Sequence, residues 1–366
     1  MHFFEKNDRI VLFFDIITHY YFLSICYNKV STKERSFFMK AIIITEQKTL
    51  AMAEVEMPTL KAGEVLIEVH AAAVNRADLM QVDGCYPPPP GCPDWPGLEV
   101  SGVIKELSPE AQAEGKWKVG DEVCALLGGG GYAEYVAVQS FMLMPVPKGL
   151  SLIESSTLPE AFATAYLNLF IEGGAKEGQT LLMHAGASGL ASVIIPMAKA
   201  FGLRVITTVL SEDFAKAISH LGADVVVDTS KENIADVLKK EAEDGHPLNI
   251  AIDCLGSSKV GECFPYVAYA CKWIMIATLA GDISEVNMRT MYVKNIRLIG
   301  STLRSKPEPY KGEILANLVK DIWPKVESGE VRPTIFKIMP ATQANEAHAL
   351  LRDGKSCGKV ILTFKD

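Results

Sequence analysis

The sequence lacks the patterns that mark disulfide-rich, zinc-binding and nucleic-acid-binding proteins. Its eight cysteines are scattered from Cys26 to Cys357, and no two of them form a C-x-x-C pair. Disulfide frameworks and zinc knuckles need closer spacing, so buried, reduced thiols and a cytoplasmic location are expected. Positive charge is also scarce, because 36 Lys and Arg oppose 44 Asp and Glu for a net charge of −8. No nucleic-acid partner is expected from this balance.

A long, clean hydrophobic run is missing as well. The most apolar N-terminal stretch, residues 11–27, is interrupted by Asp15 and His19, whereas a membrane span needs about 20 apolar residues. It is also a poor signal peptide, since acidic residues precede it and no small-residue cleavage site follows. We therefore expect no membrane partner and interpret residues 1–38 as an extension outside the core, with Met39 as the functional start. A weak membrane-binding or partner-binding arm is the alternative.

The remaining chain divides by its pattern into two kinds of structure. Hydrophobic residues make up 49% of the 366 positions, enough for two well-packed domains. Residues 39–158 show short strands (64–70, 97–104 and 120–127) separated by Gly and Pro turns, which is typical of a compact β domain. From residue 159 to 302, apolar strands (180–184, 204–209, 225–227, 250–253, 273–277 and 296–299) alternate with helices (189–201, 212–221, 234–243 and 260–270). This alternation predicts a parallel sheet covered on both faces, an α/β fold of the Rossmann type.

The C-terminal residues 303–366 return to mixed structure. A helix is expected at 344–352 and a last strand at 359–364. We interpret this tail as returning to the first domain, which makes the parallel-sheet domain an insertion.

One glycine turn lies where a dinucleotide would bind. The segment His184-Ala-Gly-Ala-Ser-Gly-Leu-Ala-Ser192 follows a strand and opens a helix. Gly186 permits the tight turn, Gly189 allows close backbone approach, and Ser188 stands where a second glycine is common. A pyrophosphate would lie on the helix N-terminus, whose unpaired N–H groups favour anions. An ordinary small βα turn is the alternative, but the βα units that follow favour a dinucleotide site.

The end of the second strand of this domain favours NADPH over NADH. An Asp or Glu about 20 residues after the first glycine usually binds the free ribose hydroxyl of NAD, and here that stretch contains Thr208 and no acid. Lys199 and Ser211 are candidates for the additional phosphate. Glu212, Asp213 and Phe214 weigh against tight NADPH binding.

Several ordered motifs together resemble one family. They include Asn75–Met80, Gly84–Pro87, Pro96–Glu99, Gly128–Tyr135, Pro159-Glu160, the glycine turn, Asp253–Gly256, Leu303–Ser305 and Gly358–Val360. From Met39 to the C-terminus the chain resembles the zinc-free quinone oxidoreductases of the medium-chain dehydrogenase/reductase superfamily, especially the tumour-suppressor-inducible type. The resemblance implies a GroES-like catalytic domain, a Rossmann domain and a homodimer.

The same resemblance bears on metal binding. Related alcohol dehydrogenases carry a catalytic Cys where this chain has Asn75, and Gly-His-Glu where it has Gly97-Leu98-Glu99; their four-cysteine lobe is missing here. Without thiolate and imidazole ligands no zinc site is expected. The chemistry left is direct hydride transfer, which depends on positioning.

The resemblance also implies roles for residues of the cleft. Tyr86 would orient or protonate the acceptor oxygen, and Asn75 would bind cofactor or substrate, although a packed turn residue and a helix cap are the respective alternatives. The remaining residues expected to contact the cofactor are Thr164, Gly186, Ser188, Gly189, Leu190, Lys199, Thr208, Ser211, Cys254, Leu255, Gly256, Ala277, Leu279, Leu303, Arg304 and Ser305.

These observations lead to one functional hypothesis with two alternatives. The first is an NADPH-dependent reductase of quinones, with α,β-unsaturated carbonyls as neighbouring small-molecule substrates. An enoyl-thioester reductase is the alternative among enzymes. A cofactor-binding scaffold without turnover is the alternative from another class.

Overall fold

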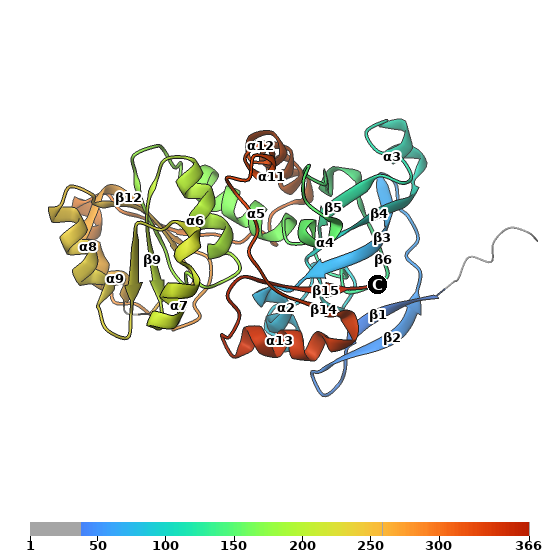
Figure 1. The fold of residues 1–366 in the computed structure, drawn as a ribbon, viewed down its shortest axis with the longest axis horizontal. Coiled ribbons are helices and arrows are strands. Elements are labelled where there is room, and N and C mark those ends of the chain that lie inside the picture. The colour runs from blue at the N-terminus through green and yellow to red at the C-terminus, as the bar shows by residue number, and fades with distance from the viewer. Residues whose placement is uncertain (1–37, 258, 366) are drawn as a thin grey trace, which may run out of the picture.

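A computed structural model describes residues 38–257 and 259–365 (Figure 1). The predicted N-terminal extension lies outside the described residues, except for Phe38 at the start of the first strand. The described chain forms two lobes side by side, each built on its own sheet (Figure 1). None of the helices in the described ranges is long and apolar enough to cross a membrane.

The strands of the first lobe pair mostly antiparallel, with one parallel pair at the edge of its larger sheet. β1 (Phe38–Ile44) and β2 (Leu50–Glu56) form a separate hairpin. The larger sheet has the order β14-β15-β3-β4-β5-β7, with β6 paired to β3. Its strands are β3 (Glu64–Ala73), β4 (Glu99–Leu107), β5 (Glu122–Leu126), β6 (Tyr135–Gln139), β7 (Leu143–Pro145), β14 (Ile335–Pro340) and β15 (Lys359–Thr363). Because β15 pairs antiparallel with β3, the C-terminal tail joins the sheet begun by the N-terminal part of the chain.

The second lobe is a six-stranded sheet of order β10-β9-β8-β11-β12-β13, and every pairing in it is parallel. Its strands are β8 (Thr180–Met183), β9 (Arg204–Val209), β10 (Val225–Asp228), β11 (Leu248–Asp253), β12 (Val267–Met275) and β13 (Arg297–Gly300). The order reverses between β8 and β11, the position where doubly wound sheets bind ligands. The predicted α/β fold class, a β domain beside a doubly wound parallel sheet of the Rossmann type, is confirmed.

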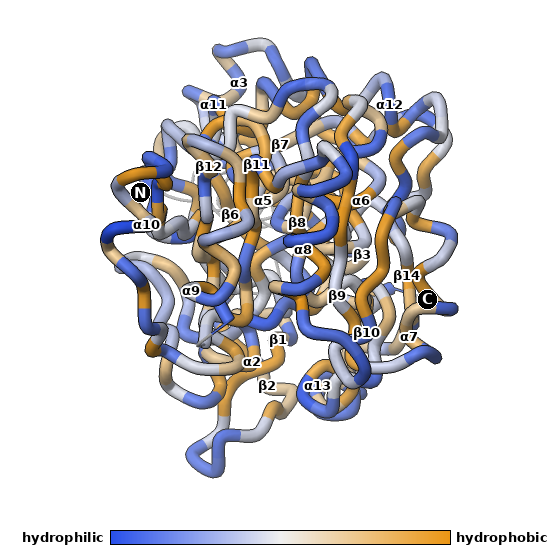
Figure 2. Tube along the Cα trace, turned by 90° about the vertical axis from the view of Figure 1, so that its left-hand side faces the viewer, coloured by the Kyte–Doolittle hydropathy of each residue, from blue (hydrophilic) through white to orange (hydrophobic). Residues whose placement is uncertain are grey.

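Helices cover this parallel sheet because their apolar sides need burial. α6 (Ala191–Ala200) packs on β8 and β9, and α8 (Ile234–Glu243) packs on β11 and β12. α7 (Glu212–Ala217), α9 (Lys259–Cys263) and α10 (Met288–Val293) are shorter. Hydrophobic positions concentrate along the strands and α6, while the outer side of α8 is hydrophilic (Figure 2).

Further helices lie between the lobes and around the first one. α5 (Pro159–Tyr166) continues as a π-helix (Leu167–Glu172) and packs against α6 and α11 (Glu308–Asp321). Beside α11 stands α12 (Trp323–Glu327). The first lobe also carries α2 (Arg76–Val82), α3 (Pro109–Ala113), α4 (Leu152–Ser155) and α13 (Ala344–Arg352).

The helix expected at 260–270 is wrong. α9 ends at Cys263, a 3₁₀ turn covers Phe264–Tyr266, and β12 already begins at Val267. Pro265 lies in this turn, where it lacks the N–H that a continuing helix needs. Ala270 has a φ of 60°, which an α-helix does not accommodate. The segment from Val267 instead pairs with β11.

Candidate active site

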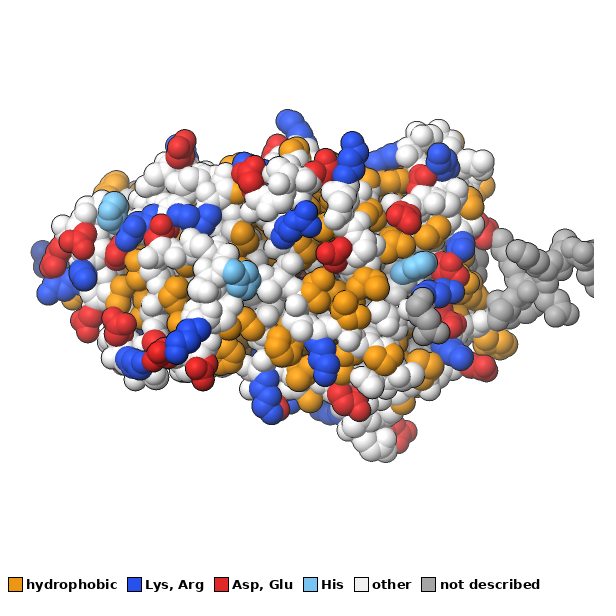
Figure 3. All heavy atoms as spheres, viewed as in Figure 1, with side chains coloured by type: hydrophobic (Ala, Val, Ile, Leu, Met, Phe, Trp, Pro, Cys, Tyr) orange, Lys and Arg blue, Asp and Glu red, His pale blue; other side chains and the backbone are white. Residues whose placement is uncertain are grey.

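A cavity of about 820 Å³ lies between the two lobes. Its walls come from the loop before α2 and the loop after it, from α5, and from the carboxyl ends of β8, β9, β11 and β12. Side chains of mostly apolar character line it, and hydrophobic side chains also gather in the middle of the face shown in Figure 3, between its more charged ends. A concave, mainly apolar site at a switch point is the usual setting for a small ligand or cofactor.

The glycine turn lies at this cavity, between β8 and α6. Ser188, Gly189 and Leu190 line it, and no described residue accepts a hydrogen bond from the N–H groups of Gly189 or Leu190. Free N–H groups at a helix start suit the pyrophosphate of a dinucleotide. A Cβ on Gly189 would stand 2.8 Å from Lys359 Cδ of the other lobe, so glycine is needed for this approach of the two lobes. The turn therefore fits a dinucleotide.

The carboxyl end of β9 presents no acid to the cavity. The cavity is lined there by Thr208, Val209, Leu210 and Phe214. Thr208 Oγ1 is hydrogen-bonded to His184 Nδ1 at 3.1 Å. The two residues expected to bind an extra phosphate have other partners and do not line the cavity. The ammonium group of Lys199 contacts both carboxylate oxygens of Asp224, at 2.8 and 2.9 Å. Ser211 Oγ accepts the N–H of Phe214 and caps α7.

Tyr86 also lines the cavity, in the loop after α2. The Arg304 guanidinium stands over its ring, 4.8 Å from the centroid. The same guanidinium donates to the backbone oxygens of Tyr86 (3.1 Å) and Gly128 (2.7 Å) and to Gln81 Oε1 (2.8 Å). Burial raises the pKa of the Tyr86 hydroxyl. Arg304 thus lines the cavity, and its donors bind the Tyr86 loop, the loop at Gly128 and Gln81 of α2.

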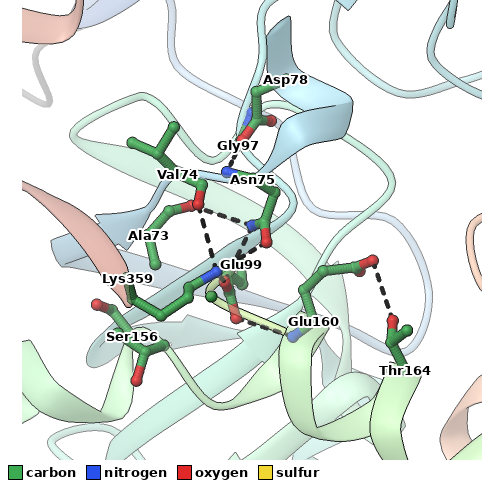
Figure 4. A network of polar contacts seen from close by, with 12 residues as sticks. Ala73, Val74, Asn75, Asp78, Gly97, Glu99, Ser156, Glu160, Thr164 and Lys359 are labelled. Carbon is green, nitrogen blue, oxygen red and sulfur yellow. Dashed lines mark hydrogen bonds and ion pairs between the residues drawn. The ribbon is translucent and has the colours of Figure 1, made fainter. Parts of the chain in front are cut away.

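A buried ammonium group forms the centre of the polar floor of the cavity (Figure 4). Lys359 Nζ donates to Glu99 Oε1 (2.7 Å), Asn75 Oδ1 (2.7 Å) and the Val74 carbonyl (3.3 Å). Asn75 Nδ2 in turn donates to Glu99 Oε1 at 2.9 Å. Lys359 and Glu99 side chains are 3% and 0% exposed. A zinc ion needs several ligand atoms that direct lone pairs at it. The Lys359 ammonium group has no lone pair and carries a positive charge, so this network does not fit a zinc ion.

A second acidic group borders this network. Glu160, at the start of α5, lines the cavity, and its Oε1 accepts a hydrogen bond from Thr164 Oγ1 at 3.4 Å. Burial, and then the nearby charge of Glu99, raise the pKa of Glu160 to about 7. Asp78, one layer deeper, accepts N–H groups from Asn75 and Gly97, and burial raises its pKa to about 6.

The structure brings most of the expected site residues to one cavity. Those that line it are Tyr86, Asn75, Thr164, Ser188, Gly189, Leu190, Thr208, Cys254, Leu255, Ala277, Leu279, Leu303 and Arg304. Gly186 lies behind the turn, where a Cβ would stand 2.5 Å from Thr207 Oγ1. The N–H of Gly256 donates a hydrogen bond to Asp253 Oδ1, and Ser305 Oγ is hydrogen-bonded to Thr302 Oγ1. Gly186, Gly256 and Ser305 do not line the cavity, and neither do Lys199 and Ser211.

Sequence reasoning gave no role to three polar residues that line this cavity, Glu160, Lys359 and Asn168, or to Glu99, which holds Lys359. Glu99, Glu160 and Lys359 are within the motifs that carried the family resemblance. The motifs therefore marked these residues, but nothing in the sequence indicated that their side chains contact one another. Asn168 stands in no such motif. It lies in the π-helix after α5, with its side-chain oxygen buried and without a partner in the described chain. Only the fold brings it to the cavity wall.

Comparison with known proteins gives consistent family matches over both lobes. The alcohol dehydrogenase GroES-like domain matches residues 61–148, and the zinc-binding dehydrogenase family matches residues 189–320. A Nematostella vectensis "quinone oxidoreductase-like protein 2 homolog" is 29% identical over 93% of this chain and 92% of its own. Mouse quinone oxidoreductase is 28% identical over 85% and 92%.

Solved structures share the architecture. A mycobacterial protein complexed with NADPH superposes with a TM-score of 0.77 and 25% identity, over 89% of this chain and 99% of that one. The enoyl reductase JamJ, in its apo form, reaches a TM-score of 0.76 with 21% identity, over 90% and 99%. The second likeness is one of fold alone.

Proposed function

This chain belongs to the medium-chain dehydrogenase/reductase superfamily of oxidoreductases, and we propose that it is an NADPH-dependent reductase of quinones. Small α,β-unsaturated carbonyls are the neighbouring substrates. The observation that carries the proposal is the cavity itself, whose mostly apolar lining includes both the dinucleotide-type turn and Tyr86. The curated relatives named as quinone oxidoreductases support the acceptor class.

The proposed reaction is a direct hydride transfer without zinc. Bound NADPH supplies the hydride, and the acceptor must be held with its electrophilic carbon within reach. Ser188, Gly189 and Leu190 hold the pyrophosphate, and Tyr86 orients the acceptor oxygen through its hydroxyl. The Lys359 ammonium is held by Glu99 and Asn75, and this closed network keeps the polar floor of the cavity in one arrangement. An ammonium group at this place supports a reaction without zinc, because it offers no lone pair to a metal ion.

NADPH is proposed over NADH on the basis of the β9 end. A carboxylate there would repel a 2′-phosphate, and neither Glu212 nor Asp213 lines the cavity. Glu212 is instead paired with Lys216 and Lys231. Lys199 and Ser211 remain proposed phosphate contacts only if the cofactor displaces their present partners.

Side-by-side fluorescence titration tests this preference. We expect NADPH to bind at least about tenfold more tightly than NADH, equivalent to about 1.4 kcal/mol. Lys199→Ala is the companion variant. A loss of NADPH affinity in it, with unchanged NADH affinity, would place Lys199 at the phosphate despite its pairing with Asp224. Equal affinities for the two cofactors in the parent protein would contradict the preference.

A homodimer is proposed through the edge of the parallel sheet. β13 is an edge strand, and exposed hydrophobic side chains lie along it and around it: Leu298, Ile283, Met288, Tyr292 and Val293. An open edge flanked by apolar side chains is a site for pairing with a second copy. We also propose a cytoplasmic location, supported by the free state of the seven described cysteines.

A further inference from the structure

Three polar residues form one stripe along the cavity wall. Glu160 and Thr164 belong to α5, and Asn168 to the π-helix that continues it. Residues four apart lie on one side of a helix, and all three line the cavity. The stripe adds a carboxyl, a hydroxyl and an amide group to the polar part of a lining that is apolar over most of its area.

Glu160 is a carboxyl group with no cation paired to it in the described chain. Its Oε1 accepts from Thr164 Oγ1, and its own backbone N–H donates to Glu99 Oε2 at 2.8 Å (Figure 4). Glu99 uses its other oxygen for Lys359 and Asn75. The nearest ammonium group is therefore already engaged by Glu99 and leaves Glu160 without an ion pair.

Charged groups from each neighbouring element act on Glu160. Glu99 of β4 and Asp78 of α2 disfavour its carboxylate, whereas Lys359 of β15 and Lys311 of α11 favour it. Besides burial, the charge of Glu160 in turn contributes to raising the pKa of Tyr86, in the loop after α2. Burial and Glu99 dominate and raise the pKa of Glu160 to about 7. A large fraction of this group is a neutral acid at neutral pH.

The far end of the stripe holds an unsatisfied acceptor. Asn168 is 1% exposed, and its Nδ2 donates to the Thr164 carbonyl at 2.8 Å. Its Oδ1 has no hydrogen-bond partner in the described chain. Buried polar atoms rarely stay unpaired, so a donor from a bound molecule or an ordered water completes this site. The orphan oxygen leaves one hydrogen-bond acceptor available at this end of the stripe.

We propose that Glu160 is the proton donor of the reaction, with Thr164 holding its carboxyl group toward the acceptor oxygen. The inference rests on the proposed reductase function. The transferred hydride brings two electrons and one hydrogen to the acceptor, which leaves a negative oxygen. Glu160 gives its carboxylic proton to that oxygen, and the O–H bond of the acid breaks as the product O–H bond forms. The Glu160 carboxylate then regains a proton from water, so one NADPH and one proton are consumed per quinone.

Tyr86 is the less suitable donor. Burial raises the pKa of its hydroxyl above the ordinary value of 10.0, whereas a donor works best when its pKa lies near the working pH. Tyr86 therefore orients the acceptor oxygen, and Glu160 supplies the proton.

The test compares Glu160→Gln with a surface control, Glu313→Gln on the exposed side of α11. In Glu160→Gln we expect kcat with an ortho-quinone to fall about a hundredfold, with NADPH affinity within about twofold of the parent. Since the donor must be protonated, parent kcat falls as pH rises above about 7, and this fall disappears in Glu160→Gln. Thr164→Val shows a smaller loss and keeps the pH dependence.

A readout independent of turnover uses infrared difference spectra. Between about pH 6 and pH 8 the parent protein should lose carboxylic-acid carbonyl absorption, and Glu160→Gln should keep only the part of that loss that belongs to Asp78, whose pKa is raised by burial to about 6. An unchanged rate and pH profile in Glu160→Gln, with an active parent, would overturn the proton-donor role alone. A parent that binds NADPH without oxidising it in the presence of quinones would overturn the proposed function and, with it, this role.

Discussion

At the scale of single residues, the cavity floor depends on one buried ion pair. Lys359 and Glu99 are almost fully enclosed, and the ammonium group has three acceptors within hydrogen-bond distance, one of them the side chain of Asn75. Removing one member of a buried pair leaves the other charge without compensation. The pair is therefore a structural requirement of the floor as well as an electrostatic element of the site.

Lys359→Met tests this requirement. We expect the free energy of unfolding to fall by about 3–5 kcal/mol, because Glu99 stays buried without its cation. Urea denaturation measures the change. Lys365→Met is the matched control, since Lys365 pairs with Glu68 at an exposed position and should lose no more than about 1 kcal/mol. Equal losses in the two variants would show that burial gives the Lys359 pair no special weight.

The residue scale is also where sequence reasoning reaches its limit. Ser188, Gly189 and Leu190 follow from a local pattern, and they line the cavity. Lys199 was expected at the cofactor because of its place in the following helix, but its partner Asp224 lies 25 residues away. Asn75, Glu99, Glu160 and Lys359 meet only through the fold, so no spacing in the sequence connects them. Pairing across such separations has no local signature.

At the scale of elements, the loop that carries Tyr86 is held from the other lobe. Arg304 follows β13 and reaches α2, the Tyr86 loop and the loop at Gly128 with one guanidinium group. A planar fork can bond several acceptors at once and also stack on a ring, whereas an ammonium group provides a point charge. Arg304 thus positions the loop that faces the acceptor.

Arg304→Lys keeps the positive charge but removes the planar guanidinium group and its several N–H donors. We expect kcat/KM for the quinone to fall about tenfold or more, because Tyr86 loses its fixed place, while NADPH affinity changes much less. Steady-state kinetics and a cofactor titration measure the two effects. Arg204→Lys, in a two-bond pair with Glu241 outside the cavity lining, serves as the control. If NADPH affinity falls as steeply as kcat/KM, Arg304 contacts the cofactor directly, as the family resemblance first implied.

Element types were predictable where the hydrophobic period is clear. The strands of the parallel sheet and the helix at 344–352 follow local periodicity, and α13 spans that range. The segment 260–270 failed because Pro265 ends the helical pattern and the pairing of Val267 with Leu248 of β11 is non-local. The ends of other helices and strands differ from the predicted ends by a few residues, because pairing with a neighbouring strand can extend a strand beyond its apolar residues.

At the scale of the whole molecule, the open edge of the parallel sheet sets the proposed assembly. Leu298 on β13 is 45% exposed, and its neighbours on α10 are also apolar and exposed. Charge on an edge strand discourages pairing with another chain. The assembly can therefore be disrupted without entering the cavity.

Leu298→Lys is expected to convert a dimer into a monomer. Light scattering after size-exclusion chromatography should give twice the chain mass for the parent protein and one chain mass for the variant. Val119→Lys introduces the same charge at a hydrophobic position of the first lobe that is 61% exposed and should leave the dimer intact. A monomeric parent protein, or a dimeric Leu298→Lys variant, would contradict pairing at this edge.

The most direct test of the central claim follows NADPH absorbance in chelator-treated protein mixed with a small ortho-quinone. The account predicts that one NADPH is oxidised for each quinone reduced and that added zinc does not raise the rate. Background-level oxidation by protein that binds NADPH, or activity that appears only when zinc is restored, would contradict it.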